Sequence, residues 1–265
     1  MNWDTDVVKK AYACLQLERR MVGVKLIYNQ AEYESLPCIE PKTPLYYCQA
    51  VHAAASGHSI KLTKETSGCP GSSRALGFTL PAENYYTGAA GENLGLYADR
   101  EVARQVASDL AICTRPLLGI AIRPLEEFDT APDVVLVFVN TREAMRILQG
   151  YTCVYGLSDS FCMSGNQAVC VECTTYPFLR QRINLSMFCA GTRHKAQWND
   201  GEAAFGIPAA MFSGVVQGLE YTVNAIERNK RKAEIEQTLD SAGLLDFEIE
   251  FGHTYFLKND VSPRI

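Results

Sequence analysis

Two similar cysteine loops contain the residues whose types and spacing point most clearly to chemistry. The chain reads Cys69-Pro70-Gly71-Ser72-Ser73-Arg74 and, further on, Cys189-Ala190-Gly191-Thr192-Arg193-His194. In both, Cys-x-Gly precedes a hydroxyl residue and a cation, and each loop is expected to open a short helix. A thiol at a helix start faces unpaired backbone N–H groups, which favour the thiolate that binds metals or attacks electrophiles. The alternative is that both cysteines only pack while the glycines make the turns.

Three further cysteines could complete a set of ligands. Cys48 and Cys170 are expected on two corresponding helices, and Cys173 shares a helix face with Cys170 because it follows at i+3. Together with Cys69 and Cys189 they offer four thiolates in two symmetric pairs, with either Cys170 or Cys173 as the fourth. Four thiolates suit an iron–sulfur cluster, with tetrahedral zinc as the alternative. The sequence does not decide between Cys170 and Cys173, and the spacing is not that of a ferredoxin.

The backbone of the two loops could hold the anionic part of a ligand or cofactor. Gly71-Ser72 and Gly191-Thr192 could present N–H groups at the start of a helix. Neither loop is a phosphate-binding P-loop, and the chain has no Gly-x-Gly-x-x-Gly, so nucleotide binding is not expected.

Four charged or titratable side chains near the loops are candidates for catalytic roles. Arg74, Arg193 and His194 could fix a carboxylate or support a thiolate. Glu202 could act as an acid or base. For each of them, a surface salt bridge or an exposed turn is the alternative reading.

Composition excludes several classes of function. A net charge of -5 and a pI of about 5.5 argue against a nucleic-acid-binding surface. No apolar run approaches the roughly 18 residues of a membrane span. The N-terminus is polar and acidic, unlike a signal peptide, so we expect a cytoplasmic protein whose ten cysteines stay reduced. A small molecule is the expected partner, with no nucleic acid and no membrane.

The elements that must position these residues are expected to come as two copies of one unit. The first has a strand at 22–28, helices at 30–36 and 46–57, and a strand at 59–63 before the Cys69 loop. The second has a strand at 134–139, helices at 141–148 and 165–176, and a strand at 182–186 before the Cys189 loop. Asn29 and Asn140 end the first strand of each copy and can cap the helix that follows.

This repetition predicts an α/β or α+β fold, a duplicated β-α-α-β unit with a pseudo-two-fold axis and a long C-terminal helix. We divide a single domain at 1–265 into a first repeat at 21–98, a connecting segment at 99–132, a second repeat at 133–207, and a C-terminal helix and tail at 208–265. Residues 79–98 are turn-rich and read as an excursion or lid, followed by a helix at 100–113 and a strand at 119–122.

Both ends of the chain have recognisable patterns as well. A first helix is expected to run from Asp4 or Thr5 to about Arg20. The helix after Pro208 has an apolar stripe, which suits either core packing or a homodimer, and is expected to continue toward Leu239. The alternation at 247–251 predicts an edge strand, and 258–265 reads as a loose tail.

Several stretches resemble the domain-of-unknown-function 169 family. They are the segment from Asn184 to Arg193, Gly201-Glu202, Gly206-Ile207-Pro208, Val22-Gly23-Val24-Lys25 and Cys48-Gln49-Ala50. The resemblance covers the chain from about Met21 to Ile226. It implies a cysteine-rich protein common in anaerobic bacteria and archaea, with no settled activity.

Three hypotheses about function follow. The first is a cytoplasmic metalloprotein that holds an iron–sulfur cluster between the repeats and acts as an oxidoreductase or lyase in anaerobic redox chemistry on a small molecule. The second is a metal-free enzyme with Cys69 or Cys189 as nucleophile and Arg193 or His194 orienting the substrate. The third is a protein that binds a small ligand between its halves without chemistry.

Overall fold

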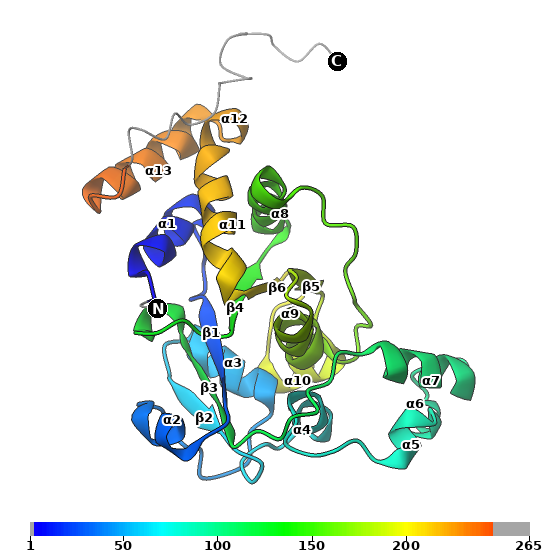
Figure 1. Ribbon diagram of the computed structural model, residues 1–265. Coiled ribbons are helices and arrows are strands. Elements are labelled where there is room, and N and C mark those ends of the chain that lie inside the picture. Colours follow the sequence, from blue (N-terminus) through cyan, green and yellow to red (C-terminus); the bar gives the residue numbers. More distant parts are fainter. Residues whose placement is uncertain (1–2, 246–265) are drawn as a thin grey trace.

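A mixed α/β architecture is built on one antiparallel sheet in the computed structural model, which describes residues 3–245 (Figure 1). Within that range six strands pair in the order β2-β3-β1-β4-β6-β5. Their bounds are Val22–Ile27 (β1), Ile60–Leu62 (β2), Gly119–Pro124 (β3), Val134–Val139 (β4), Asn184–Ser186 (β5) and Ala203–Pro208 (β6). Five of these match expected strands. The strand β6 was missed, because its Gly206-Ile207-Pro208 segment was read only as part of a loop.

The order of elements is the same on either side of the central pair, β1 and β4. These two strands are antiparallel, with Val22 opposite Leu136 and Val24 opposite Val134. Outward from them lie β3 and then β2 on one side, and β6 and then β5 on the other. β3, from the segment expected to connect the repeats, occupies the place that β6 has in the other half. This arrangement is compatible with the duplication, which stays a prediction.

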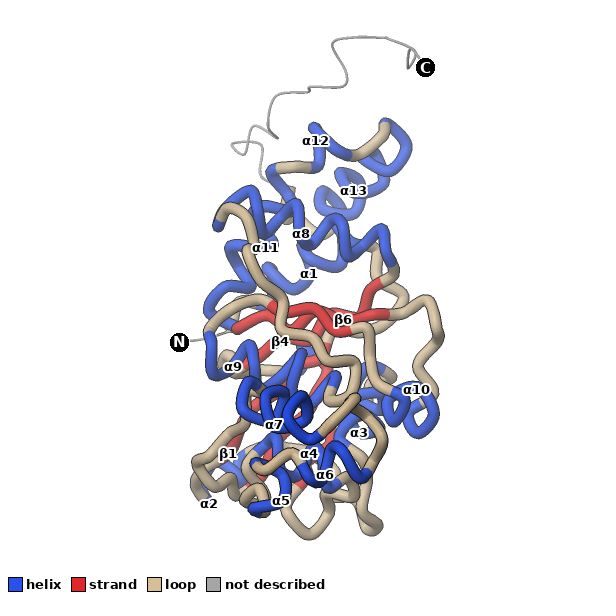
Figure 2. The backbone as a smooth tube through the Cα atoms, turned by 90° about the vertical axis from the view of Figure 1, so that its right-hand side faces the viewer, coloured by secondary structure: helices blue, strands red, loops and turns tan. Residues whose placement is uncertain are grey.

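The strand β4 divides the core into two. All six of its residues are buried, as its apolar sequence predicts. Because successive side chains of a strand point to opposite faces, Val134, Leu136 and Phe138 join one hydrophobic cluster, and alternate residues such as Val135 and Val137 join the other. The sheet is therefore covered on both faces, as Figure 2 shows from its edge.

One face of the sheet carries the first helix of the chain, the helix that follows β4, and the three C-terminal helices. They are Thr5–Leu15 (α1), Thr141–Tyr155 (α8), Ala209–Tyr221 (α11), Val223–Ile226 (α12) and Asn229–Ser241 (α13). The predicted long C-terminal helix is wrong in its length, since it breaks after Tyr221 and again around Glu227. The Glu227 carboxylate lies 2.9 Å from Nε of Arg146 and also pairs with Arg142, which fixes the second break beside α8. The helix α1 ends at Leu15 rather than Arg20, because Gln16 adopts a left-handed conformation.

The other face of the sheet carries the helices that hold or directly follow the cysteines of the predicted site. They are Tyr47–Ala55 (α3), Pro70–Leu76 (α4), the π-helix Ala168–Thr175 (η2), Tyr176–Arg180 (α9) and Ala190–Ala196 (α10). The π-helix was expected as ordinary helix. In addition, the Thr174 hydroxyl donates to the carbonyl of Val169, five residues earlier, at 2.7 Å.

The segment between β2 and β3 carries three more helices, which lie beyond α4 at the lower right of Figure 1. They are Glu83–Tyr86 (α5), Ala89–Asn93 (α6) and Arg100–Asp109 (α7), and two short helices, Gln30–Ser35 (α2) and Leu125–Glu127 (η1), complete the fold. Asn29 caps α2 and Asn140 caps α8, as predicted. The edge strand expected at 247–251 and the tail at 258–265 lie outside the described residues. Within residues 3–245, the helices are too short or too polar to cross a membrane.

Candidate functional site

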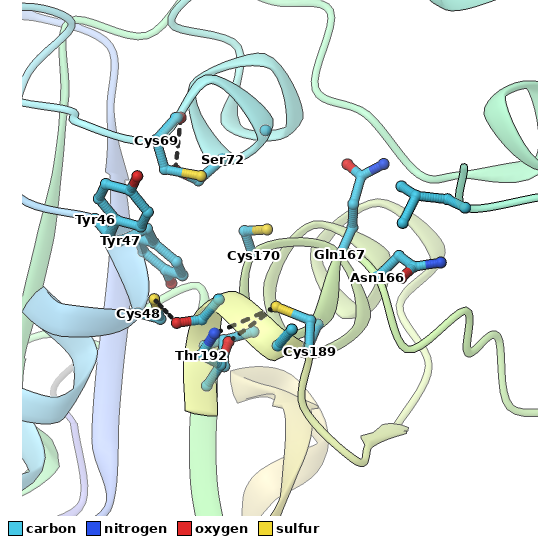
Figure 3. Close-up of a pocket in the computed structure, with 16 residues that line it drawn as sticks. Tyr46, Tyr47, Cys48, Cys69, Ser72, Asn166, Gln167, Cys170, Cys189 and Thr192 are labelled. Carbon is cyan, nitrogen blue, oxygen red and sulfur yellow. Dashed lines mark hydrogen bonds between the residues drawn. The ribbon is translucent and has the colours of Figure 1, made fainter. Parts of the chain in front are cut away.

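A cavity of about 250 Å³ lies between α3, α4, η2 and α10 on one face of the sheet. Figure 3 shows four thiols arranged around it, each from a different element. They are Cys48, Cys69, Cys170 and Cys189. The remaining walls come mostly from apolar or small residues, with Tyr46, Ser72, Asn166, Gln167 and Thr192 as the polar ones. The structure therefore brings together four of the five cysteines expected to form one site.

Cys48 is held by a helix that is tied to both of its neighbours. The hydroxyl of Tyr47 and Oγ1 of Thr174 are 2.8 Å apart, which joins α3 to η2. Gln49 donates from Nε2 to the backbone carbonyl of Lys195 at 3.1 Å, which joins α3 to α10. The Cys48 thiol lies 4.0 Å from the carbonyl of Gly191. These ties fix the Cys48 side chain at the meeting point of three helices.

Cys69 and Cys189 occupy the same structural position in the two halves. Each is the N-cap residue of its helix, so the prediction that both loops open a helix is confirmed. The Cys189 sulfur accepts a hydrogen bond from the backbone N–H of Thr192 at 3.4 Å and lies 3.3 Å from its hydroxyl. Cys69 makes no such bond within the described chain, and Ser72 instead donates to the Cys69 carbonyl at 3.1 Å. The two thiols thus differ in their surroundings although both cysteines are N-cap residues.

The π-helix decides between Cys170 and Cys173. Cys170 lines the cavity. Cys173 is fully buried on the side facing the sheet, with its sulfur 3.4 Å from the carbonyl of Ala204 on β6. The wider turn of the π-helix separates two residues that an α-helix would place on nearly the same face. Cys173 is therefore a core residue, and Cys170 is the one that belongs to the site.

Burial keeps two of the thiols protonated. Burial, together with the nearby Cys189 and Cys69, raises the pKa of Cys48 to about 12, because burial disfavours the thiolate and thiolates repel one another. Burial likewise raises the pKa of Cys170 well above its ordinary value, with Cys69, Cys189 and Cys48 acting in the same direction. The four thiols are therefore close enough to influence one another electrostatically.

The thiols surround the cavity rather than a point. Across residues 3–245, no three side chains from Cys, His, Asp and Glu come together closely enough to hold one metal ion. A tetrahedral zinc would need its sulfurs to converge, since the Zn–S bond is only about 2.3 Å long.

Arg193 and Glu202, expected as catalytic residues, lie outside the cavity and hold the chain behind α10. Arg193 donates from Nη2 to the carbonyls of Met187 at 3.0 Å and Glu202 at 2.9 Å. The Glu202 carboxylate pairs with Arg19, and Oε2 accepts from the backbone N–H of Asn199 at 2.7 Å. These contacts stabilise the turn before β6.

The other two candidates for catalytic roles, His194 and Arg74, lie outside the thiol cavity as well. His194 is exposed on α10 and does not line the cavity. Arg74 lines a second cavity beyond α4, with its guanidinium carbon 4.1 Å from the centroid of the Tyr85 ring. His52 packs edge-on against Trp198, with ring centroids 5.0 Å apart, and does not line the cavity.

Several residues that line the cavity were missed by sequence reasoning, among them Asn166, Gln167, Leu96 and Tyr46. Asn166 and Gln167 directly precede η2, and this polar pair before the Cys170 helix was the available signal. Leu96 comes from the turn-rich segment that was read as an excursion or lid. Tyr46 precedes α3, and its backbone N–H donates to Oε1 of Gln49 at 3.0 Å, which caps the helix.

Comparison with known proteins places the chain in a family. The family model described as "Uncharacterised ArCR", domain of unknown function 169, matches residues 12–218. An uncharacterised protein of Methanocaldococcus jannaschii, MJ0308, is 25% identical over 219 residues, which cover 80% of this chain and 92% of that protein. No solved structure matches the chain. The chain belongs to the domain-of-unknown-function 169 family, as the stretches around its cysteines predicted.

Proposed function

We propose that this member of the family binds an iron–sulfur cluster through Cys48, Cys69, Cys170 and Cys189. The observation that carries the proposal is the arrangement of four thiols, from four elements and both halves of the sheet, around one cavity. Cysteine thiolates are the usual ligands of such clusters. The bound protein would act in the cytoplasm as an oxidoreductase or lyase on a small molecule, in the chemistry of an anaerobic cell.

The spread of the thiols favours a cluster over zinc. Ligands of a single tetrahedral ion must gather within a few ångströms, which no three candidate side chains do within the described chain. A cluster has several iron atoms and therefore meets its ligands at separate corners. The cavity of about 250 Å³ between the thiols leaves room for such a body.

The raised pKa values of Cys48 and Cys170 are compatible with this proposal. Burial holds protons on Cys48 and Cys170, so binding must release them in exchange for the positive charge of iron. The pH dependence of cluster assembly should follow, with assembly favoured as the pH rises. The apolar walls would then influence the reduction potential by limiting access of water.

Replacement of the two N-cap cysteines tests the proposal. The variant with Cys69→Ala and Cys189→Ala should retain little iron and sulfide after anaerobic purification, because half of the ligands are gone. Cys153→Ala is the matched control, since Cys153 is exposed on α8 across the sheet, and it should keep the content of the unmodified protein. Equal iron and sulfide in all three proteins would overturn the proposal.

A second candidate is a metal-free enzyme with Cys189 as nucleophile. The hydrogen bond from the Thr192 N–H to the Cys189 sulfur favours this residue over Cys69, since such a bond stabilises a thiolate. Rapid stoichiometric labelling of Cys189 by iodoacetamide in metal-free protein would support it. Uniformly slow labelling of both Cys69 and Cys189 would exclude it.

A further inference from the structure

A second cavity of about 290 Å³ adjoins the thiol cavity. The two share the lining residues Gly71, Leu96, Asn166 and Gln167. The second cavity lies between α4 and the excursion helices α5, α6 and α7. A molecule bound in it would therefore have one end next to the thiols.

Arg74 is the only charged side chain among the described residues that line this second cavity. It lies on α4, in the helical turn that follows Cys69 and Gly71. Its guanidinium stacks on the Tyr85 ring, and its Nε is buried without a hydrogen-bond partner. Within residues 3–245 no carboxylate forms an ion pair with it, whereas Arg100 and Arg104 on α7 pair with Glu92 and Glu101.

Arg74 is partly buried, and a guanidinium nitrogen that is buried without a hydrogen-bond partner is costly unless a ligand supplies an acceptor. Guanidinium groups bind carboxylates through two parallel hydrogen bonds. The rest of the wall is largely apolar, with side chains such as Leu94, Ala103 and Val106. Arg74 supplies a single positive charge, so a monoanion with an apolar body fits this space better than a phosphate dianion.

We propose that the second cavity binds a small apolar carboxylate, with its carboxylate on Arg74 and its apolar part among α6 and α7. This names the substrate class of the site proposed above and rests on that function for any chemistry at the thiols. The binding itself rests on Arg74 and the cavity alone. Arg74 is thus a residue that selects and orients the substrate.

Binding of benzoate, with benzamide as its uncharged analogue, tests the assignment. Both are titrated into the full-length protein by saturation-transfer NMR, and iron and sulfide are measured in the same samples. The unmodified protein should bind benzoate more tightly than benzamide. Arg74→Gln should weaken benzoate by about tenfold or more, because a charge-assisted hydrogen bond is worth about 1.5–3 kcal/mol.

Two further variants serve as controls. Arg104→Gln removes the same charge from an exposed position on α7 and should leave benzoate binding unchanged. Arg74→Lys keeps the charge but loses the bidentate geometry, so it should retain the preference for benzoate with reduced affinity. It also provides a readout if Arg74→Gln does not fold.

The outcomes separate this inference from the proposed function. No preference for benzoate over benzamide, or equal benzoate binding by the Arg74→Gln protein, would overturn the carboxylate site even if iron and sulfide are present. Arg74-dependent benzoate binding by a protein without iron and sulfide would support the carboxylate site and count against the cluster.

Discussion

Cys48 shows how burial sets the chemistry of a single residue in this protein. Its thiol lies where three helices meet, and burial together with Cys189 and Cys69 raises its pKa to about 12. At neutral pH, Cys48 is therefore an uncharged thiol in the metal-free protein. Only a positively charged partner, such as iron, would make its thiolate stable near neutrality.

This shift predicts a stability that depends on pH. The folded protein holds the proton of the Cys48 thiol more tightly than the unfolded chain does. In the unfolded chain the pKa of a cysteine thiol is about 8.5. The contribution of Cys48 to the free energy of unfolding is therefore complete below the pKa of the unfolded chain. It is lost as the pH rises toward about 12. In metal-free protein, the free energy of unfolding in urea should fall from about pH 8 to about pH 10, and less steeply in Cys48→Ala.

The control for this measurement is again Cys153→Ala. Cys153 is exposed on α8, so its replacement should keep the slope of the unmodified protein. Identical slopes for Cys48→Ala and the unmodified protein would contradict the raised pKa of Cys48. Cys14 and Cys113, whose pKa values burial raises to about 12 and about 11, contribute to the slope in all three proteins.

Sequence reasoning reached the cysteines but not the arginine and glutamate beside them. The cysteines were found because they recur at matched positions, in a loop that opens a helix and on the helix before it. The contact of Glu202 could not be foreseen because its partner, Arg19, lies 183 residues away in the chain. The contacts of Arg193 could not be foreseen because its acceptors are backbone carbonyls, which residue types do not reveal.

At the level of elements, the π-helix η2 controls what faces the cavity. It packs so closely on β6 that a Cβ on Gly206 would lie 2.1 Å from the carbonyl oxygen of Cys173. Its buried Glu172 accepts from the backbone N–H groups of Ser164 at 2.6 Å and Gly165 at 2.9 Å. These contacts hold both the helix and the chain that leads into Asn166 and Gln167. The position of Cys170 follows from them.

Gly206→Ala should therefore disturb the site through the backbone. The added methyl group must push η2 away from the sheet, which should lower the free energy of unfolding by about 1–3 kcal/mol. Cys170 moves with the helix, so iron content should fall as well. Gly201→Ala is the matched control because nothing lies within 4 Å of the added atom, and it should change stability by less than about 0.5 kcal/mol. Equal urea denaturation of the two variants would contradict the close packing.

Helices and strands were predictable where one pattern dominated. The apolar run 134–139 and the asparagine caps at positions 29 and 140 were correctly read. The π turn at Ala168–Thr175 was not, because it depends on tertiary packing against β6. The breaks after Tyr221 and near Glu227 were missed, because the ion pairs of Glu227 with α8 lie outside any local pattern.

At the scale of the whole molecule, the cavity is lined by thiols from both halves of the fold. Cys48 and Cys69 come from the half built around β1, and Cys170 and Cys189 from the half built around β4. A group bound by all four would link segments more than 100 residues apart, and binding to the folded state alone would stabilise the fold. If the predicted duplication is correct, one local pattern, repeated, supplies the proposed ligands from both halves.

The most direct test is the iron and acid-labile sulfide content of the unmodified protein, purified without oxygen, together with its visible absorption spectrum. The account predicts iron and sulfide in comparable amounts and the broad absorption of thiolate-bound iron. A colourless protein without iron and sulfide, from cells able to assemble clusters, would contradict the assignment of the four thiols as cluster ligands.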